Sequence, residues 1–262
     1  MRIDVAILPG QRFDASASVC VVVDVLRASS SIVTLLERGC EAIAAAADIG
    51  EARKLHAALP GYLLCGEEHG LPPEGFDYGN SPVEFSRLDL AGKPAVLATS
   101  NGTRVLAALA AESPAVLVGC LLNRTAVARA ALAIAGARGL DITVVCSAAL
   151  RHSASGGGSG QAPGGSVFVL EDALGAGAIA DAALAADPAL VAGDAARFAR
   201  DAFAMSKPRI GEAVRSAYHA QELVDVGLGD DVAYCGQLDT STVAPLLEHG
   251  EGGVLALRPY AP

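Results

Sequence analysis

Long apolar runs alternate with helical patterns along this chain, and the alternation predicts an α/β fold. Residues 19–23 are apolar without interruption, which is typical of a strand buried on both faces of a parallel sheet. Asp24, Arg27 and a run of serines follow, and apolar residues then recur at helical spacing as far as Gly39. We expect the serines to cap the N-terminus of this helix and Gly39 to end it in a left-handed conformation.

The strand–turn–helix pattern recurs downstream. Further strands are predicted at 3–8, 41–47, 62–65, 94–98, 115–119, 141–148 and 166–169, with a short one in 230–247. Helices are predicted at 49–59, at 104–111, at 126–135 with Gly136 as the stop, after 169, and over 188–226 with a break at Lys207-Pro208. Ser81, Pro82 and Glu84 form a capping box that marks one more helix start. These elements favour a three-layer α/β/α fold with a largely parallel or mixed sheet. Residues 1–262 then form a single unit or two intertwined subdomains.

Composition and charge narrow the function classes. The formal net charge of −10 and the pI near 4.9 would repel a polyphosphate backbone, so we expect no nucleic-acid partner. No apolar stretch is long enough to cross a bilayer, and the start, with Asp4, does not look like a signal peptide. Six scattered cysteines without a CxxC pair favour a reducing cytoplasm. The alanine-rich helices are compatible with a homodimer.

Residues 151–166 are rich in glycine and serine and are predicted to be a flexible insert. The segment lacks the lysine followed by serine or threonine that ends a phosphate-binding P-loop. We therefore look for the functional site at the strand-to-helix junctions.

Three of these junctions each carry an arginine: Arg27, Arg104 and Arg124. Asn101 and Asn123 stand beside two of them. Ligands of open α/β sheets bind beyond the carboxyl ends of the strands, where helix N-termini attract anions. We predict that the three guanidinium groups converge on one anion above an edge of the sheet. The alternative is that each arginine caps a loop or pairs with an acidic neighbour.

Acidic residues lie beside the same junctions, notably Asp24, Glu67, Glu171 and Asp172. Mg²⁺ prefers oxygen ligands, needs only one or two carboxylates, and both neutralises a phosphate ester and activates water. The sequence therefore predicts a Mg²⁺ site for a phosphate ester. The alternative for Glu171 and Asp172 is a simple interaction with the helix dipole.

Other phosphatase chemistries lack their residues here. No cysteine is followed by an arginine six positions later, and Leu26 stands where aspartate-nucleophile enzymes need a second aspartate. Arg151-His152 is not followed by the glycine of histidine phosphatases. Lone histidines such as His69 and His219 are more often surface or core residues than ligands. His219 keeps some interest because it opens a helix-like stretch near the acidic tail.

Six short motifs, in order, resemble those of the 2-phosphosulfolactate phosphatase (ComB) family. They are DVLRASS, GEEHG, GFDYGNSP, TSNGTR, GCLLNRTAVA and LEDALGAGAI, which together span about residues 19–180. SAYHAQELVDVG and DDVAYC are weaker matches. Ser100, Ala220 and the expanded 151–166 segment depart from the family pattern, and the insert puts specificity in question more than chemistry.

The resemblance implies a Mg²⁺-dependent acid phosphatase. It would hydrolyse 2-phospho-3-sulfolactate, or a related small phospho-acid, to 3-sulfolactate and phosphate, a step toward coenzyme M. The predicted catalytic residues are Asp24, Arg27, Arg104, Arg124 and Asp172. The predicted substrate-binding residues are Ser29, Asn80, Ser81, Ser100, Asn101, Gly102, Thr103 and Asn123. The predicted metal ligands are Asp24, Glu67, Glu171 and Asp172.

The sequence leaves open whether water or Asp24 attacks phosphorus. It also leaves two other function classes. A non-catalytic phosphometabolite-binding protein would share the arginines but would not need grouped carboxylates. A phosphosugar isomerase or transferase would need a clear acid/base pair, and none stands out.

Overall fold

The computed structural model describes residues 1–8, 11–147, 149–150, 166–250 and 253–261. The predicted insert at 151–166 lies outside the described residues, apart from Ser166. The strands are β1 (Arg2–Ala6), β2 (Ser18–Val23), β3 (Ile43–Ala46), β4 (Leu63–Gly66), β5 (Ala95–Ala98), β6 (Ala115–Gly119), β7 (Asp141–Cys146), β8 (Ala149–Leu150), β9 (Ser166–Val167), β10 (Val191–Ala192), β11 (Pro245–His249) and β12 (Leu255–Pro259). The α-helices are α1 (Ala28–Glu37), α2 (Ile49–Ala58), α3 (Pro82–Ser86), α4 (Gly102–Ala110), α5 (Arg124–Arg138), α6 (Leu170–Ala186), α7 (Asp194–Ser206), α8 (Ile210–Arg215), α9 (Tyr218–Asp225) and α10 (Gly229–Cys235).

Ten strands of the described chain form one mixed sheet, in the order β10-β1-β7-β2-β6-β11-β12-β3-β5-β4. The strands β10, β1, β7, β2 and β6 are parallel to one another, and so are β3, β5 and β4. The antiparallel pair β11–β12 joins the two groups and is antiparallel to β6 on one side and to β3 on the other. The two parallel groups consequently run in opposite senses.

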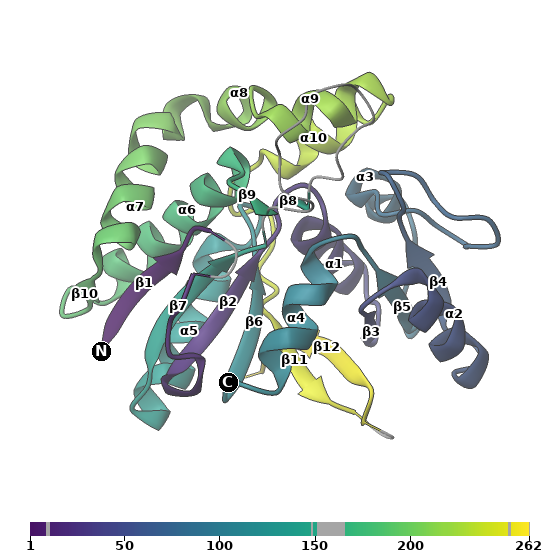
Figure 1. Ribbon diagram of the computed structural model, residues 1–262, viewed down its shortest axis with the longest axis horizontal. Helices are drawn as coiled ribbons and strands as arrows, with labels where there is room; N and C mark the ends of the chain where they lie inside the picture. The colour runs from purple at the N-terminus through teal and green to yellow at the C-terminus, as the bar shows by residue number, and fades with distance from the viewer. Residues whose placement is uncertain (9–10, 148, 151–165, 251–252, 262) are drawn as a thin grey trace, which may run out of the picture.

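Helices cover both faces of the sheet, which confirms the predicted three-layer α/β/α arrangement (Figure 1). Successive side chains of β2 belong alternately to two hydrophobic cores. Val21 and Val23 pack in the core that contains α5, α6 and α7, whereas Cys20 and Val22 pack in the core that contains α1, α3 and α4. A smaller cluster joins α2 to β3, β4 and β5. All of β2 is buried, as its unbroken apolar run predicts.

Most predicted elements are present, with corrections in α5 and in the tail. Helix α5 continues through Gly136 and ends at Gly139, whose φ of 65° is left-handed. A Cβ built on Gly136 would meet no atom within 4 Å, so that glycine neither turns the chain nor makes room for a neighbour. Gly39, with φ of 89°, does follow the end of α1 as predicted. In the tail, residues 229–235 form α10, and the strand there, β11, begins only at Pro245.

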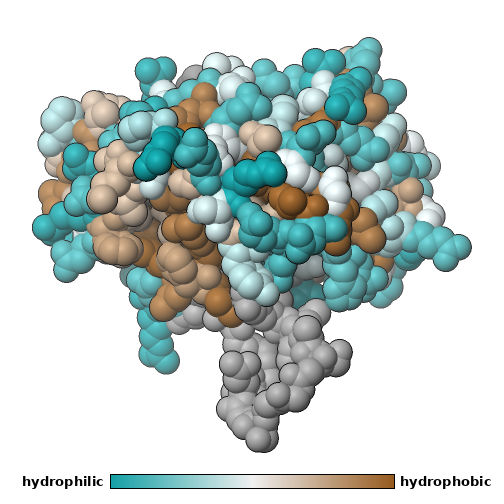
Figure 2. Space-filling model, turned by 90° about the horizontal axis from the view of Figure 1, so that it is seen from above, coloured by the Kyte–Doolittle hydropathy of each residue, from teal (hydrophilic) through white to brown (hydrophobic). Residues whose placement is uncertain are grey.

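The surface carries both apolar and hydrophilic side chains (Figure 2). Seen from above, apolar side chains gather left of centre amid hydrophilic ones (Figure 2). Among the described helices, none has both the length and the apolar character needed to cross a membrane. The six cysteines are buried and form no disulfide.

Candidate active site

Asp24 lies where β2 gives way to α1, and only 6% of its surface is exposed. Its Oδ1 accepts a hydrogen bond from the backbone N–H of Ala28, the first residue of α1, at 3.2 Å. The hydroxyl of Ser29 accepts from the N–H of Asp24 at 2.9 Å. The predicted serine cap is therefore wrong, because no serine caps α1 and the Asp24 carboxylate meets the positive end of that helix.

Asp172, in the first turn of α6, lies beside Asp24. Its Oδ1 accepts from the N–H of Val25 at 2.8 Å, and its Oδ2 accepts from the hydroxyl of Ser147 at 3.1 Å. Burial, with the charges of Asp24 and Glu171, raises the pKa of Asp172 well above its ordinary value. Burial also raises the pKa of Asp24, against the lowering effects of His219 and Ser147. Two carboxylates this close and out of water favour a shared proton or a cation.

Glu171 and His219 extend this group of acidic residues toward the surface. Glu171 is 1% exposed, and its Oε1 lies 3.3 Å from Nδ1 of His219. The other oxygen, Oε2, is buried and has no hydrogen-bond partner among the described residues. Burial lowers the pKa of His219, but the hydrogen bond and charge of Glu171 and the charge of Asp24 outweigh it, so that pKa is raised. We call Asp24, Glu171 and Asp172 the carboxylate cluster.

The raised pKa of Asp172 makes stability depend on pH. Its contribution is fully present below the unfolded value of 3.8 and is lost as the pH rises through the folded value. In EDTA, we expect Asp172→Asn to gain stability over the wild type as the pH rises above 3.8, because only the wild type must then keep a buried carboxyl group protonated or bury its charge. The amide can still accept from Val25 and donate to Ser147. Urea unfolding at each pH measures the difference, and one that stays constant with pH would contradict the raised pKa.

The turn before α4 is held by hydroxyls and by Glu67. The Thr103 hydroxyl accepts from the N–H of Thr99 at 3.1 Å, and the Thr99 hydroxyl accepts from the N–H of Thr103 at 3.3 Å. Glu67 Oε1 accepts from the N–H of Ser100 at 2.7 Å, and its Oε2 accepts from the N–H of Gly70 at 2.9 Å. Both oxygens of Glu67 therefore tie this turn to the loop after β4.

Gly102 brings α4 against Asp24. A Cβ built on Gly102 would lie 2.8 Å from the Cβ of Ala28 and 2.9 Å from Oδ2 of Asp24. The turn after β5 thus reaches the end of β2, although their parallel groups run in opposite senses. Because the Cβ of Ala28 is fixed to the backbone of α1 and cannot turn aside, we expect Gly102→Ala to reduce the free energy of unfolding by about 1–3 kcal/mol.

Gly136→Ala is the matched control for this substitution, because the α5 site is open. It should raise the free energy of unfolding by about 1 kcal/mol through helix propensity. Urea denaturation of the two variants measures both changes. Equal effects in the two variants would contradict the close approach at Gly102.

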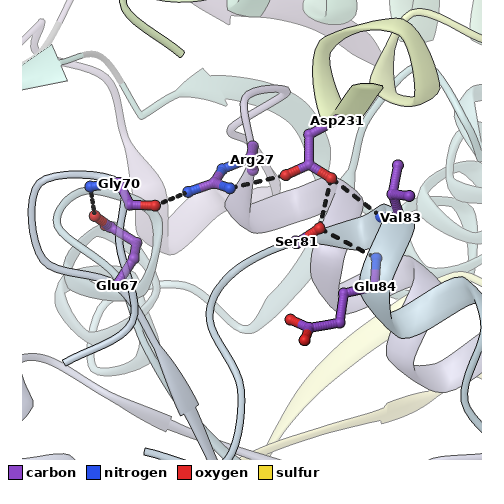
Figure 3. Close-up of polar contacts among 7 residues, drawn as sticks. All are labelled: Arg27, Glu67, Gly70, Ser81, Val83, Glu84 and Asp231. Carbon is purple, nitrogen blue, oxygen red and sulfur yellow. Dashed lines mark hydrogen bonds and ion pairs between the residues drawn. The ribbon is translucent and has the colours of Figure 1, made fainter. Parts of the chain in front are cut away.

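Arg27 is buried, with 4% of its surface exposed, and its guanidinium is held on two sides (Figure 3). Its Nη1 donates to Oδ2 of Asp231 at 2.8 Å, and its Nη2 donates to the carbonyl oxygen of Gly70 at 2.8 Å. Oδ1 of Asp231 accepts from the hydroxyl of Ser81 at 2.7 Å and from the N–H of Val83 at 3.2 Å. Since a guanidinium has five N–H groups, these contacts leave donors for a ligand.

The other two arginines make their contacts elsewhere. Arg104 is exposed, and its Nε donates to the carbonyl oxygen of Ala47 at 3.3 Å. Arg124 Nε lies 2.8 Å from Oδ2 of Asp239, whose Oδ1 accepts from the N–H of Thr125 at 2.9 Å. The N-terminus of α5 therefore already has a carboxylate from the chain itself. These contacts fit the alternative of local pairing better than convergence on one anion, and the catalytic roles of Arg104 and Arg124 stay predictions.

The predicted asparagines differ in their surroundings. Asn123 is fully engaged, since its Oδ1 accepts from the N–H of Cys120 at 2.9 Å and its amide donates to two backbone carbonyl oxygens. Asn101 is partly exposed just before α4 and does not cap it. Asn80 is 4% exposed, and its Oδ1 is buried without a hydrogen-bond partner in the described chain. Asn80 is consequently the asparagine best suited to a ligand contact.

The carboxylate cluster suits a hard cation. No group of three or more His, Cys, Asp or Glu side chains in the described ranges is already arranged to hold a metal. Mg²⁺ needs only one or two carboxylates and keeps several waters. The repulsion between Asp24 and Asp172 and the unpartnered Oε2 of Glu171 fit such an ion. Glu67 has both oxygens engaged by backbone N–H groups, and its role as a ligand stays a prediction.

Sequence reasoning missed Ser147 and Asp231 in this region, and it gave His219 no role in the site. Ser147 directly follows β7, the same kind of strand-end position that singled out Asp24, so a signal was present. His219 pairs with Glu171 and is not simply a core or surface residue. The weak motifs SAYHAQELVDVG and DDVAYC contain His219 and Asp231, and they were the other signal.

Comparison of the sequence with known proteins shows the family to which the chain is similar. The family described as 2-phosphosulpholactate phosphatase matches residues 8–250. A protein of Deinococcus radiodurans named probable 2-phosphosulfolactate phosphatase is 37% identical over 251 residues, covering 96% of this chain and 95% of its own. Proteins with the same name are 35% identical in Pseudothermotoga lettingae, covering 93% and 95%, and 33% identical in Thermotoga petrophila, covering 95% and 96%.

Proposed function

The chain belongs to the 2-phosphosulfolactate phosphatase family, and on this premise we propose that it is a phosphoric monoester hydrolase. Its substrate is 2-phospho-3-sulfolactate or a related small anionic phospho-acid, and its products are the free hydroxy acid and phosphate. The observation that carries the proposal is the buried carboxylate cluster at the end of β2, in which burial raises the pKa values of Asp24 and Asp172 and the charge of Asp24 adds to the shift of Asp172. Strongly perturbed buried groups of this kind gather at catalytic sites.

Positive groups for the ester lie around this cluster. Arg27 offers the N–H groups that Asp231 and Gly70 do not engage. Helix α4 begins at Gly102, and although the Thr99 hydroxyl accepts from the N–H of Thr103, the positive end of the helix dipole still attracts phosphate oxygens. The substrate carries a phosphate of roughly −1.5 to −2 charge besides its other acidic groups. Arg27 and the α4 turn therefore bind and orient the phosphate.

We propose Mg²⁺ as the cofactor, with Asp24, Glu171 and Asp172 as its candidate ligands. Bound there, Mg²⁺ would offset the charge of the ester and lower the pKa of a water. Without a cation, the carboxylates of Asp24 and Asp172 would repel both each other and the substrate. Substrate affinity should then depend on the cation.

The attacking group is either a water or the carboxylate of Asp24. If a water attacks, Asp24 and Asp172 orient it and accept its proton. If Asp24 attacks, a phosphoaspartate forms and is hydrolysed in a second step. The stereochemical course at a chiral, isotopically labelled phosphorus separates these routes, since a single in-line attack by water inverts the configuration and two successive displacements through a phosphoaspartate retain it.

The proposed function is tested by phosphate release from 2-phospho-3-sulfolactate and a panel of other phospho-acids, each with Mg²⁺ and with EDTA. We expect Mg²⁺-dependent release, fastest for substrates with a second acidic group. Binding of the phospho-acids without release would instead support a phosphometabolite-binding protein. We also propose a cytoplasmic location, which the free cysteines favour.

A further inference from the structure

Asp231 is a buried carboxylate that the proposed chemistry does not yet use. It lies in α10, is 2% exposed, and meets Arg27 across 204 positions of sequence. Its two oxygens have separate tasks: Oδ2 accepts from Arg27, and Oδ1 accepts from Ser81 and Val83. Figure 3 shows Asp231 between the Arg27 guanidinium and the start of α3.

We propose that Asp231 is a positioning residue, which holds the Arg27 guanidinium in the orientation that binds the phosphate of the substrate. This inference rests on the proposed function. Arg27 is fixed by Asp231 on one side and by the neutral Gly70 carbonyl on the other. A buried guanidinium needs an opposite charge close by, and Asp231 supplies the one ion pair that Arg27 makes within the described residues.

The contacts on both sides of this ion pair reach other predicted ligand groups. Gly70 is tied through Glu67 to Ser100 in the α4 turn. On the other side, Asp231 fixes Ser81, which follows Asn80, whose Oδ1 has no hydrogen-bond partner among the described residues. Asp231 therefore sets the position of Arg27 relative to the groups on both sides of it.

The geometry allows the contact with Arg27 to be broken alone. In Asp231→Asn, the amide oxygen can still accept from Ser81 and Val83, while the NH₂ group faces the N–H groups of Arg27. The matched control is Asp230→Asn, because Asp230 is the exposed neighbour in the same helix. A purely structural role for Asp231 would lower the melting temperature without a selective effect on phosphate recognition.

The experiment measures kcat/KM with 2-phospho-3-sulfolactate and the affinity for inorganic phosphate in the presence of Mg²⁺. We expect Asp231→Asn to lower kcat/KM by about 100-fold and phosphate affinity by about 10-fold, the usual range for groups that orient a ligand-binding residue. Asp230→Asn should stay within about twofold of the wild type. In the Arg27→Lys background, adding Asp231→Asn should lower kcat/KM by less than about threefold further, because Asp231 acts through Arg27.

Each outcome bears on one claim. A wild type that neither hydrolyses the ester nor binds phosphate removes the proposed function, and the positioning role with it. If the wild type is active but Asp231→Asn and Asp230→Asn have equal kcat/KM values, only the positioning role is overturned. The same holds if Asp231→Asn lowers kcat/KM by the full 100-fold when Arg27 is already replaced by lysine. If Asp231→Asn does not fold, Asp231→Glu keeps the charge and shifts it by one methylene. Reduced kcat/KM at a wild-type melting temperature then supports the role, and wild-type turnover overturns it.

Discussion

Asp24→Asn should lower kcat for phosphate-ester hydrolysis by at least about 10³-fold, the scale of losing a group that acts directly on the reacting atoms. The free energy of unfolding in EDTA should equal or exceed that of the wild type. The reason is that the neutral amide removes the repulsion with Asp172, while its oxygen still accepts from the N–H of Ala28. Loss of activity with a gain of stability is typical of a site whose residues serve function at the expense of the fold.

Steady-state kinetics and urea unfolding of the same preparations measure both effects. Asp230→Asn serves as the control, since it removes one carboxylate from an exposed position. If Asp24→Asn keeps near-normal kcat but loses several kcal/mol of stability, Asp24 is only the structural cap of α1. That result would remove it from the reaction.

Arg27→Ala should lower kcat/KM by about 10³-fold, because it removes a buried cation that is proposed to bind the phosphate. In this variant Asp231 would remain buried without its partner. We therefore also expect a loss of about 3–5 kcal/mol in the free energy of unfolding.

The two effects of Arg27→Ala can be separated. Adding Asp231→Asn should restore much of the stability, since the unpaired charge is gone, but none of the activity. Arg138→Ala is the control, because Arg138 is exposed and its guanidinium donates to a backbone carbonyl oxygen. Recovery of turnover in the double variant would show that Arg27 matters only as the partner of Asp231.

The layers of the fold were predictable because burial leaves a local pattern. The unbroken apolar run of β2 and the helical spacing of apolar residues in α1 each reflect how that element is buried in the core. The insertion of β11 and β12 between two oppositely running groups was not predictable, because no local pattern specifies which strands pair across the chain. At the end of α5, Gly136 and Gly139 carry the same local signal, and only tertiary structure distinguishes them.

The residues of the site were likewise predictable only in part. Asp24, Glu171 and Asp172 were predictable as candidates, since they stand at strand-to-helix junctions. Arg124 shows the limit of that reasoning, because the local sequence does not reveal that Asp239, 115 positions away, is its partner. Asp231 was missed for the same reason, since its contact with Arg27 exists only in the folded chain. Residue type and position predict what a side chain can do, and the fold decides which partner it meets.

Location of a bound divalent ion tests the central claim most directly. Mn²⁺ can stand in for Mg²⁺ at oxygen-ligand sites and is visible by anomalous scattering from crystals soaked with it. The account predicts an anomalous peak within coordination distance, about 2.0–2.5 Å, of carboxylate oxygens of Asp24, Glu171 or Asp172. A peak at another acidic surface only, or none at a Mn²⁺ concentration that supports full turnover, would contradict it.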